Sequence, residues 1–221
     1  MLKKRLTLLC GHYGSGKTNI AVNLALAARQ THERVAIADL DVVNPYFRTK
    51  DSAPALADAG VRLICSPYAG SNVDIPALPQ EMYALTDDKA LTAVIDVGGD
   101  DRGALALGRL APAILAEGDY EMLLVVNRHR PLTPDAAAVA EVMREIETAC
   151  GIPFTGVVNN SNLGAETTAK TVLDSLSYAD AVCEACALPL VMTTVRRDLC
   201  PALAGRVPHL FPLDLQVNPY V

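Results

Sequence analysis

The chain has 221 residues, of which 51% are apolar and 20% are charged, and its formal net charge at pH 7 is −6. This acidic balance argues against broad binding to nucleic acid or to anionic membranes, so neither is an expected partner. The sequence contains no apolar leader of the signal-peptide type and no run near the roughly 18 apolar residues of a membrane span, so we expect a cytoplasmic protein.

The length fits one domain over residues 1–221, which is large enough to bury a core without disulfides or structural metals. Half the residues are apolar and tryptophan is absent, a composition typical of α/β sheets. In a cytoplasmic protein, the six cysteines are expected to be thiols or ligands rather than disulfides.

The first predicted strand, Leu6 to Cys10, leads into Gly11-His12-Tyr13-Gly14-Ser15-Gly16-Lys17-Thr18, a G-x-x-x-x-G-K-T sequence, and a helical pattern follows from Asn19 to Arg29. The motif is specific in this strand–loop–helix setting. Glycines let successive backbone N–H groups point at a polyphosphate, and the helix adds partial positive charge. We therefore predict a nucleotide-binding loop from Gly11 to Asn19, in which Lys17 reaches the β- and γ-phosphates and the Thr18 hydroxyl binds Mg²⁺.

Strand-like and helix-like segments alternate along the rest of the chain, which is typical of a parallel sheet covered by helices on both faces. A long amphipathic helix is predicted after Thr133-Pro134-Asp135. We expect an α/β fold of the P-loop NTPase type, with three α/β/α layers and a mostly parallel sheet of about seven strands. The further strands are predicted at 34–38, 61–65, 91–95, 120–126, 154–158 and 188–192.

Polar residues follow several of these strands, and ligands of such sheets lie at the carboxyl ends of the strands. Asp39 and Asp41 end the second strand, Asp96 ends the fourth and Asn159 ends the sixth. A single aspartate at a strand end is often a helix cap or turn former, but three beside a phosphate-binding loop favour phosphoryl chemistry. We expect Asp96 to hold Mg²⁺ through water and Gly99 to sense the γ-phosphate. Of Asp39 and Asp41, one would face the metal and the other the attacking water.

These motifs, in this order, resemble the MinD/ParA branch of the CobQ/CobB/MinD/ParA family of P-loop ATPases, which includes the nitrogenase iron protein and metal-cluster maturation ATPases. The resemblance covers nearly the whole chain. It implies a homodimer that encloses ATP between its subunits. It also implies roles for individual residues: Lys17 and Thr18 bind phosphates and Mg²⁺, Asp39 supports the metal, Asp41 positions the attacking water, Asp96 completes the magnesium shell and Asn159 contacts adenine.

The loop departs from this branch at one position. Members usually carry a second lysine near the start of the loop, which reaches the partner's ATP, and His12 stands there. An imidazole is mostly neutral at pH 7 and does not supply the same fixed charge. Either this chain has no cation that reaches the partner's ATP, or another cation such as Arg48, Lys50 or Arg102 replaces the lysine. For His12, loop packing and a phosphate-facing role both stay open.

The identity of the nucleotide is predicted from an absent motif. A guanine site commonly resembles Asn/Thr-Lys-x-Asp at a strand end, and neither Asn159-Asn160-Ser161-Asn162 nor Asn127-Arg128-His129-Arg130 supplies it. Adenine, which is read by an amide side chain and backbone groups, suits the first of these segments better. We therefore expect ATP, with Mg²⁺, to be the ligand.

Cys183-Glu184-Ala185-Cys186 is the single C-x-x-C of the sequence. Cluster-carrying members of the resembled branch bridge an iron–sulfur cluster with a pair of thiolates from each subunit. Two cysteines three residues apart at the end of a helix also serve as small apolar packing residues. We favour packing over an iron–sulfur cluster at Cys183 and Cys186, since one pair needs a dimer to complete four ligands.

These features together predict a Mg²⁺-dependent ATP-binding protein with slow ATP hydrolysis, in which the nucleotide state controls dimerisation and contact with an unidentified partner protein. A DNA-facing basic surface and a C-terminal membrane helix are not found, which leaves a switch for assembly or activation of a metalloenzyme or redox enzyme. The alternative is a P-loop phosphotransferase acting on a small molecule or polynucleotide, with its acceptor near Ser66 to Pro79.

Overall fold

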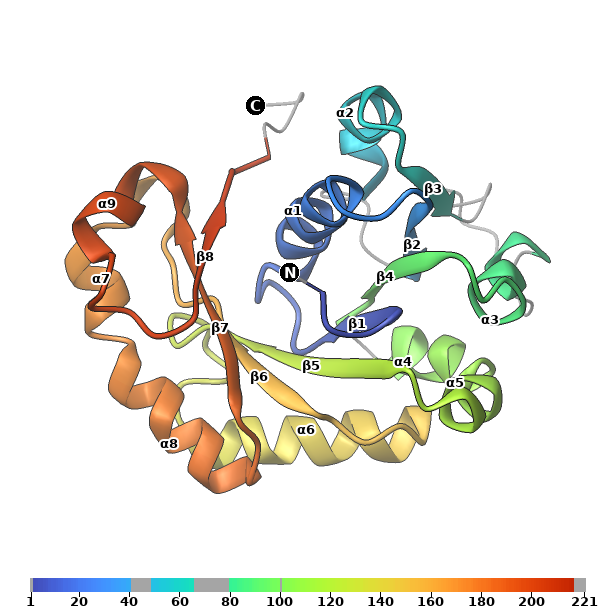
Figure 1. Cartoon of the computed structure of the whole chain (residues 1–221). Coiled ribbons are helices and arrows are strands. Elements are labelled where there is room, and N and C mark those ends of the chain that lie inside the picture. The colour runs from blue at the N-terminus through green and yellow to red at the C-terminus, as the bar shows by residue number, and fades with distance from the viewer. Residues whose placement is uncertain (1, 41–48, 66–79, 100, 217–221) are drawn as a thin grey trace.

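The fold is one parallel sheet with helices packed on both faces (Figure 1). The computed structural model describes residues 2–40, 49–65, 80–99 and 101–216. Within these ranges, eight strands are hydrogen-bonded in the order β3-β2-β4-β1-β5-β6-β7-β8, and every neighbouring pair is parallel. The strands are β1 (Leu6–Cys10), β2 (Val35–Leu40), β3 (Arg62–Cys65), β4 (Thr92–Val97), β5 (Tyr120–Val126), β6 (Gly156–Asn159), β7 (Leu190–Arg196) and β8 (Leu210–Leu213).

Helices connect these strands, and the predicted three-layer α/β/α arrangement is confirmed. They are α1 (Lys17–Arg29), α2 (Ala53–Asp58), α3 (Ala84–Asp87), α4 (Asp101–Gly108), α5 (Ala111–Glu117), α6 (Ala136–Cys150), α7 (Ala169–Leu173), α8 (Leu176–Cys186) and α9 (Cys200–Leu203). Four short 3₁₀ segments, η1 (Thr49–Ser52), η2 (Gln80–Tyr83), η3 (Gly164–Glu166) and η4 (Arg197–Leu199), complete the described elements. None of the described helices has the length and apolar character needed to cross a membrane.

The sheet differs from the prediction by one strand, since β8 adds an eighth to the expected seven or so. This strand has four residues and contains Pro212, which the sequence pattern does not favour in a strand. Proline is tolerated there because β8 is the last strand of the described sheet and pairs only with β7. The sheet is also entirely parallel where we expected it to be mostly parallel.

Side chains alternate along the central strands between two apolar cores. In β1, Leu6 and Leu8 enter the core beneath α4, α5, α6 and α8, whereas Leu9 enters the core shared with α1 and α2. The two groups of helices lie on opposite faces of the sheet in Figure 1. This period of two follows from the pleat. It places the side chains of Asp39 and Asp96 on the α1 face, because each lies two residues after a strand residue of that core.

The predicted long helix is confirmed as α6, which begins directly after Asp135. The Asp135 carboxylate accepts from the backbone N–H of Ala138 at 3.0 Å, which caps the helix, and Gly151 ends it with φ of 72°. Val139 is fully buried, while Met143 and Ile146 pack against the same core.

Candidate nucleotide-binding site

The segment from Gly11 to Thr18 runs from the end of β1 into the first turn of α1. Gly11 and Gly16 have φ of 145° and 90°, conformations that residues with a side chain rarely adopt. A Cβ added at Gly16 would also collide with the side-chain amide of Asn160. The backbone N–H of Ser15 donates to the carbonyl of His12 at 3.2 Å and closes the curl. This is the curled backbone that the motif predicts.

Lys17 is the first residue of α1 and is 6% exposed. Its ammonium donates to the carbonyl of Gly11 at 2.9 Å and to that of His12 at 3.3 Å, so the side chain is folded back onto the first half of the loop. A buried ammonium needs acceptors, and a polyphosphate offers charged acceptors in place of these carbonyls. The predicted contact of Lys17 with phosphate would exchange these carbonyls for phosphate oxygens, and it stays a prediction.

Two buried carboxylates lie on neighbouring strands at the same edge of the sheet. Asp39 of β2 is the register partner of Asp96 of β4, and the two residues are 5% and 1% exposed. Adjacent parallel strands are spaced by about 4.8 Å, so these side chains are neighbours on the face that carries α1. The Thr49 hydroxyl donates to Oδ2 of Asp96 at 3.1 Å and helps to hold that carboxylate.

The chemistry of this donor set fits Mg²⁺. Asp39, Asp96 and the Thr18 hydroxyl offer hard oxygen ligands, and Mg²⁺ is usually bound by one or two carboxylates together with water and substrate phosphates. In the part of the chain that the structure describes, no three His, Cys, Asp or Glu side chains are grouped to hold a metal by themselves. A magnesium ion at this edge would therefore draw part of its coordination from the nucleotide.

Gly99, which follows β4, packs directly against the loop. A Cβ at this position would lie 2.6 Å from the backbone nitrogen of Tyr13 and 3.0 Å from the Lys17 ammonium. Contacts this short are essentially absent from folded proteins, so only glycine fits here. The position agrees with the predicted role beside the γ-phosphate, and the contact itself stays a prediction.

Asn159 and Asn160 have different environments. Asn159 is fully buried, and its amide donates to the Ser175 hydroxyl at 2.9 Å and accepts from the backbone N–H of Ser161 at 3.2 Å. Asn160 is the residue that meets the loop: its amide donates to the carbonyl of Ser15 at 2.6 Å. The predicted contact of Asn159 with adenine would require its amide to leave these partners.

Asn19 and Asn23 on α1 hold the segment that follows β8. The side-chain oxygen of Asn19 accepts from the backbone N–H of Gln216 at 3.0 Å. Asn23 makes a two-way pair with the backbone of Asp214, both bonds being 2.9 Å long. The Asn19 side chain thus has a structural partner, and its contact with a nucleotide stays a prediction.

The remaining predicted residues fall into two groups. His12 is half-buried and its Nδ1 lies 3.1 Å from the carbonyl of Tyr13, so the ring is turned onto its own loop. Tyr13 is 55% exposed. The predictions for Asp41 and Arg48 lie outside the described residues, as do those for the side chains of Lys50 and Arg102.

Sequence reasoning missed a cation that lies against the loop. The Arg130 guanidinium carbon is 3.3 Å from the position that a Cβ of Gly14 would occupy. Burial lowers the pKa of the neighbouring His129, and the positive charges of Arg128 and Arg130 lower it further. The signal in the sequence was this basic triplet at the end of β5, on the same edge as the loop.

The cysteine pair lies near the amino ends of the strands, opposite the carboxyl ends that carry the loop. Cys183 and Cys186 are in the last turn of α8, which leads to the start of β7, whereas the phosphate loop follows the end of β1. Cys186 is 8% exposed within the core, and Cys183 packs against the same core. Burial raises the pKa of both thiols. These environments agree with the packing role favoured from the sequence.

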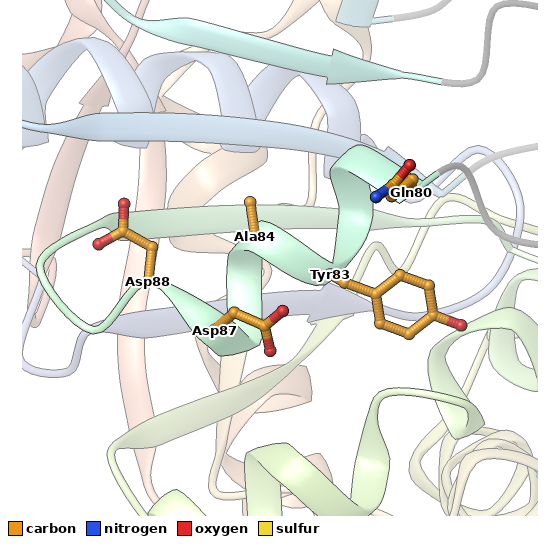
Figure 2. Close-up of a pocket in the computed structure, with 5 residues that line it drawn as sticks. All are labelled: Gln80, Tyr83, Ala84, Asp87 and Asp88. Carbon is orange, nitrogen blue, oxygen red and sulfur yellow. The ribbon is translucent and has the colours of Figure 1, made fainter.

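An open cavity of about 750 Å³ lies beside η2 and α3, lined by Gln80, Tyr83, Ala84, Asp87 and Asp88 (Figure 2). Asp88 precedes β4, so this end of the cavity is at the amino ends of the strands. The Arg34 guanidinium donates to the Asp88 carboxylate, and this hydrogen bond lowers the pKa of Asp88. The lining of this cavity includes none of the loop or strand-end residues described above, and the candidate site is the loop edge.

The curled loop, the lysine folded across it and the paired aspartates define a nucleotide-binding protein of the P-loop class. The chain belongs to the CobQ/CobB/MinD/ParA nucleotide-binding domain family, whose model matches residues 10–185. It is similar to the iron–sulfur cluster carrier protein of Methanocaldococcus jannaschii, with 26% identity over 72% of this chain and 60% of that protein. The chain thus spans less than two thirds of the length of this relative.

Solved structures of P-loop proteins share the fold. The cell division protein FtsY of Thermotoga maritima has a TM-score of 0.55 and 17% identity, covering 86% of this chain and 61% of that one. The signal recognition particle 54 kDa protein of Aeropyrum pernix, solved in complex with GDP, has a TM-score of 0.53 and 15% identity, covering 85% and 40%. At these identities the likeness concerns the fold alone, and it confirms the predicted P-loop NTPase architecture.

Proposed function

We propose that this chain binds ATP with Mg²⁺, hydrolyses it slowly and acts as a nucleotide-dependent switch. The observation that carries the proposal is that one edge of the sheet carries both the loop lysine, Lys17, and the paired residues Asp39 and Asp96. Phosphoryl transfer needs cations on the β- and γ-oxygens and oxygen ligands for the metal, and this edge supplies both kinds of group.

Each group has a separate task in this proposal. Lys17 exchanges the carbonyls of Gly11 and His12 for phosphate oxygens, and the loop N–H groups cradle the β-phosphate. Thr18, Asp39 and Asp96 would hold Mg²⁺, which neutralises charge on the transferring phosphoryl group when bound. We assign the attacking water to Asp41 on the basis of the family resemblance.

We propose ATP as the nucleotide because the sequence has no guanine-reading Asn/Thr-Lys-x-Asp at a strand end. The amide-rich turn after β6 offers donors and acceptors of the kind that adenine accepts. Equal competition by GTP for bound ATP would contradict this assignment.

We also propose that the ATP-bound state is a homodimer that acts in the cytoplasm on a partner protein, and that this partner is a metalloenzyme or redox enzyme. The family membership supports the dimer, and the iron–sulfur carrier relative supports the class of partner. The half-buried His12 does not offer the fixed charge of a second loop lysine.

The proposal is tested with purified protein and MgATP in the absence of any acceptor, by measuring phosphate release and molecular mass in solution. Slow phosphate release together with a dimer that forms with ATP and dissociates with ADP supports the switch. A monomer that hydrolyses ATP only after an acceptor molecule is added would overturn it in favour of a phosphotransferase.

Lys17→Ala is the variant for this test, and Lys170→Ala on α7 is its matched control. Lys170 is exposed and pairs with Asp174 within its own helix region, away from the loop. We expect Lys17→Ala to abolish MgATP binding and Lys170→Ala to retain it, because only the first removes a cation from the phosphates.

A further inference from the structure

A second cation approaches the phosphate loop from the turn after β5. The guanidinium of Arg130 lies with Cζ and Nε both 3.3 Å from the position of a Cβ on Gly14, so it rests against the loop backbone. Gly14 has φ of 76° and no side chain, which leaves room for this approach. Arg130 is exposed and its guanidinium makes no hydrogen bond or ion pair with any described residue.

The turn that carries Arg130 is itself well anchored. The side chain of Asn127, which is 1% exposed, accepts from the backbone N–H of His129 at 3.0 Å and donates to the carbonyl of Asn162 at 3.3 Å. The backbone N–H of Arg130 donates to the carbonyl of Asn127 at 3.1 Å. At the other end of the turn, the Tyr178 hydroxyl donates to the carbonyl of Thr133 at 2.8 Å. The guanidinium is therefore carried by a fixed support.

The position of Arg130 along the loop indicates which phosphates it meets. The Lys17 ammonium lies on the first half of the loop, at Gly11 and His12, and in P-loops this lysine reaches the β- and γ-phosphates. Gly99 touches Tyr13 and Lys17 at the same end. Gly14 follows Tyr13 directly, so Arg130 lies at the part of the loop where the terminal phosphates, rather than the base, are expected.

We propose that Arg130 contacts the β- and γ-phosphates of the bound nucleotide and stabilises the charge that develops there, from within the same subunit. This role rests on the proposed nucleotide binding at the loop. An arginine fork matches phosphate oxygens in geometry and charge, and one placed in cis increases phosphoryl-transfer rates strongly. Arg130 supplies a permanent positive charge at the phosphates, which the imidazole of His12 does not. No lysine from a partner subunit is then needed for this charge.

The test compares Arg130→Ala with the wild-type protein in the affinity for MgATP and for MgADP and in phosphate release at saturating ATP. We expect a loss of ATP affinity of about ten- to a hundredfold, a smaller loss for ADP, and a hydrolysis rate at least about tenfold lower. Arg130→Lys should recover part of both properties, because it keeps the charge and loses the fork.

Arg128→Ala is the matched control. Arg128 is exposed in the same turn, but its guanidinium donates to the carbonyl of Asp174, away from the loop. It should bind and hydrolyse ATP as the wild type does. If Arg130→Ala and Arg128→Ala had the same ratio of ATP to ADP affinity and the same hydrolysis rate, the proposed role of Arg130 would be refuted. The proposed function of the chain would not be affected by that result. A wild-type protein that binds neither nucleotide would instead refute the proposed function.

Discussion

The side-chain amide of Asn160 donates to the backbone carbonyl of Ser15 at 2.6 Å and ties the end of β6 to a phosphate loop that lies 145 residues earlier. On its other side, the Asn160 oxygen accepts from the Thr194 hydroxyl of β7 at 2.5 Å. Two kinds of contact therefore hold the loop. One is the bond from Asn160, which is itself fixed by β7, and the other is the hydrogen bond between Ser15 and His12 within the loop. The bond from Asn160 explains why Gly16, against which Asn160 packs, has no room for a side chain.

We predict that Asn160→Ala loosens the loop. The substitution leaves the buried carbonyl of Ser15 without this donor, which costs about 1–3 kcal/mol of unfolding free energy. Urea titration should show this loss, and a titration with fluorescent ATP should show weaker binding.

Thr155→Ala is the comparison for Asn160→Ala. The Thr155 hydroxyl accepts from the backbone N–H of Met122 at 3.0 Å and donates to its carbonyl at 3.2 Å, at the amino end of β6. It should lose stability and keep its ATP affinity. Equal losses of affinity in the two variants would show that the bond to Ser15 is irrelevant to binding.

We predict that Gly99→Ala prevents normal ATP binding. The new methyl group would lie 2.6 Å from the Tyr13 backbone nitrogen, so the loop or the end of β4 must move. Overpacking of this kind costs about 1–3 kcal/mol. Isothermal titration with MgATP measures the effect.

Gly108→Ala provides the control for Gly99→Ala, since its Cβ would meet its nearest neighbour, the carbonyl of Ala149, at 3.4 Å. This variant should bind ATP normally. If Gly99→Ala also binds ATP normally, the loop does not depend on a bare backbone at this position.

We predict that a buried ion pair between Arg5 and Glu117 stabilises the fold at neutral pH and not in acid. Arg5 and Glu117 have side chains that are 8% and 11% exposed, and hydrogen bonds from Arg5 and then Lys89 lower the pKa of Glu117 from 4.5 to about 2. The folded state binds a proton on Glu117 less readily than the unfolded state does, so the ionised carboxylate stabilises the fold at any pH above about 4.5. This stabilisation is lost as the pH falls from about 4.5 to about 2. Glu117→Gln should therefore be less stable than wild type by about 1–3 kcal/mol at pH 7, and the difference should vanish near pH 2.

Urea unfolding at pH 7, 4 and 2.5 checks this difference. Asp174→Asn, which removes an exposed pair with Lys170, should stay within about 0.5 kcal/mol of wild type throughout. A gap between wild type and Glu117→Gln that does not change with pH would contradict the assignment to ionisation.

We predict that Cys183 and Cys186 do not bind an iron–sulfur cluster. Burial raises the pKa of both thiols, and thiolates rather than thiols are metal ligands and nucleophiles. Alkylation at pH 7.5, followed by mass spectrometry, should be slow at both positions until urea is added. Anaerobic reconstitution with iron and sulfide should give the same absorption spectrum for wild type and for the double alanine variant. Thiolate–iron absorption that disappears in the double variant would establish the cluster.

The sequence predicted those parts of the site that depend on local order along the chain. The loop from Gly11 to Thr18 lies between a strand and a helix, and Asp39 and Asp96 end buried strands, because motif spacing and apolar runs are local properties. Parallel pairing then brings the two carboxylates together at one edge.

The parts that sequence reasoning missed depend on contacts between distant segments. Asn159 and Asn160 are adjacent and chemically identical, and only the packed structure directs one at Ser175 and the other at Ser15. The approach of Arg130 to Gly14 likewise depends on β5 lying beside β1. β8 was missed because a four-residue strand with a proline has no distinctive periodicity.

The bonds from Asn19 and Asn23 to Gln216 and Asp214 join residues that are 197 and 191 positions apart. During translation, α1 leaves the ribosome long before the residues that bond to Asn19 and Asn23 have been synthesised. A nascent chain can form the loop and α1 early, but the hydrogen bonds from α1 to residues 214 and 216 form only after residue 216 has emerged. The packing of α1 against the segment that follows β8 should therefore form late in synthesis.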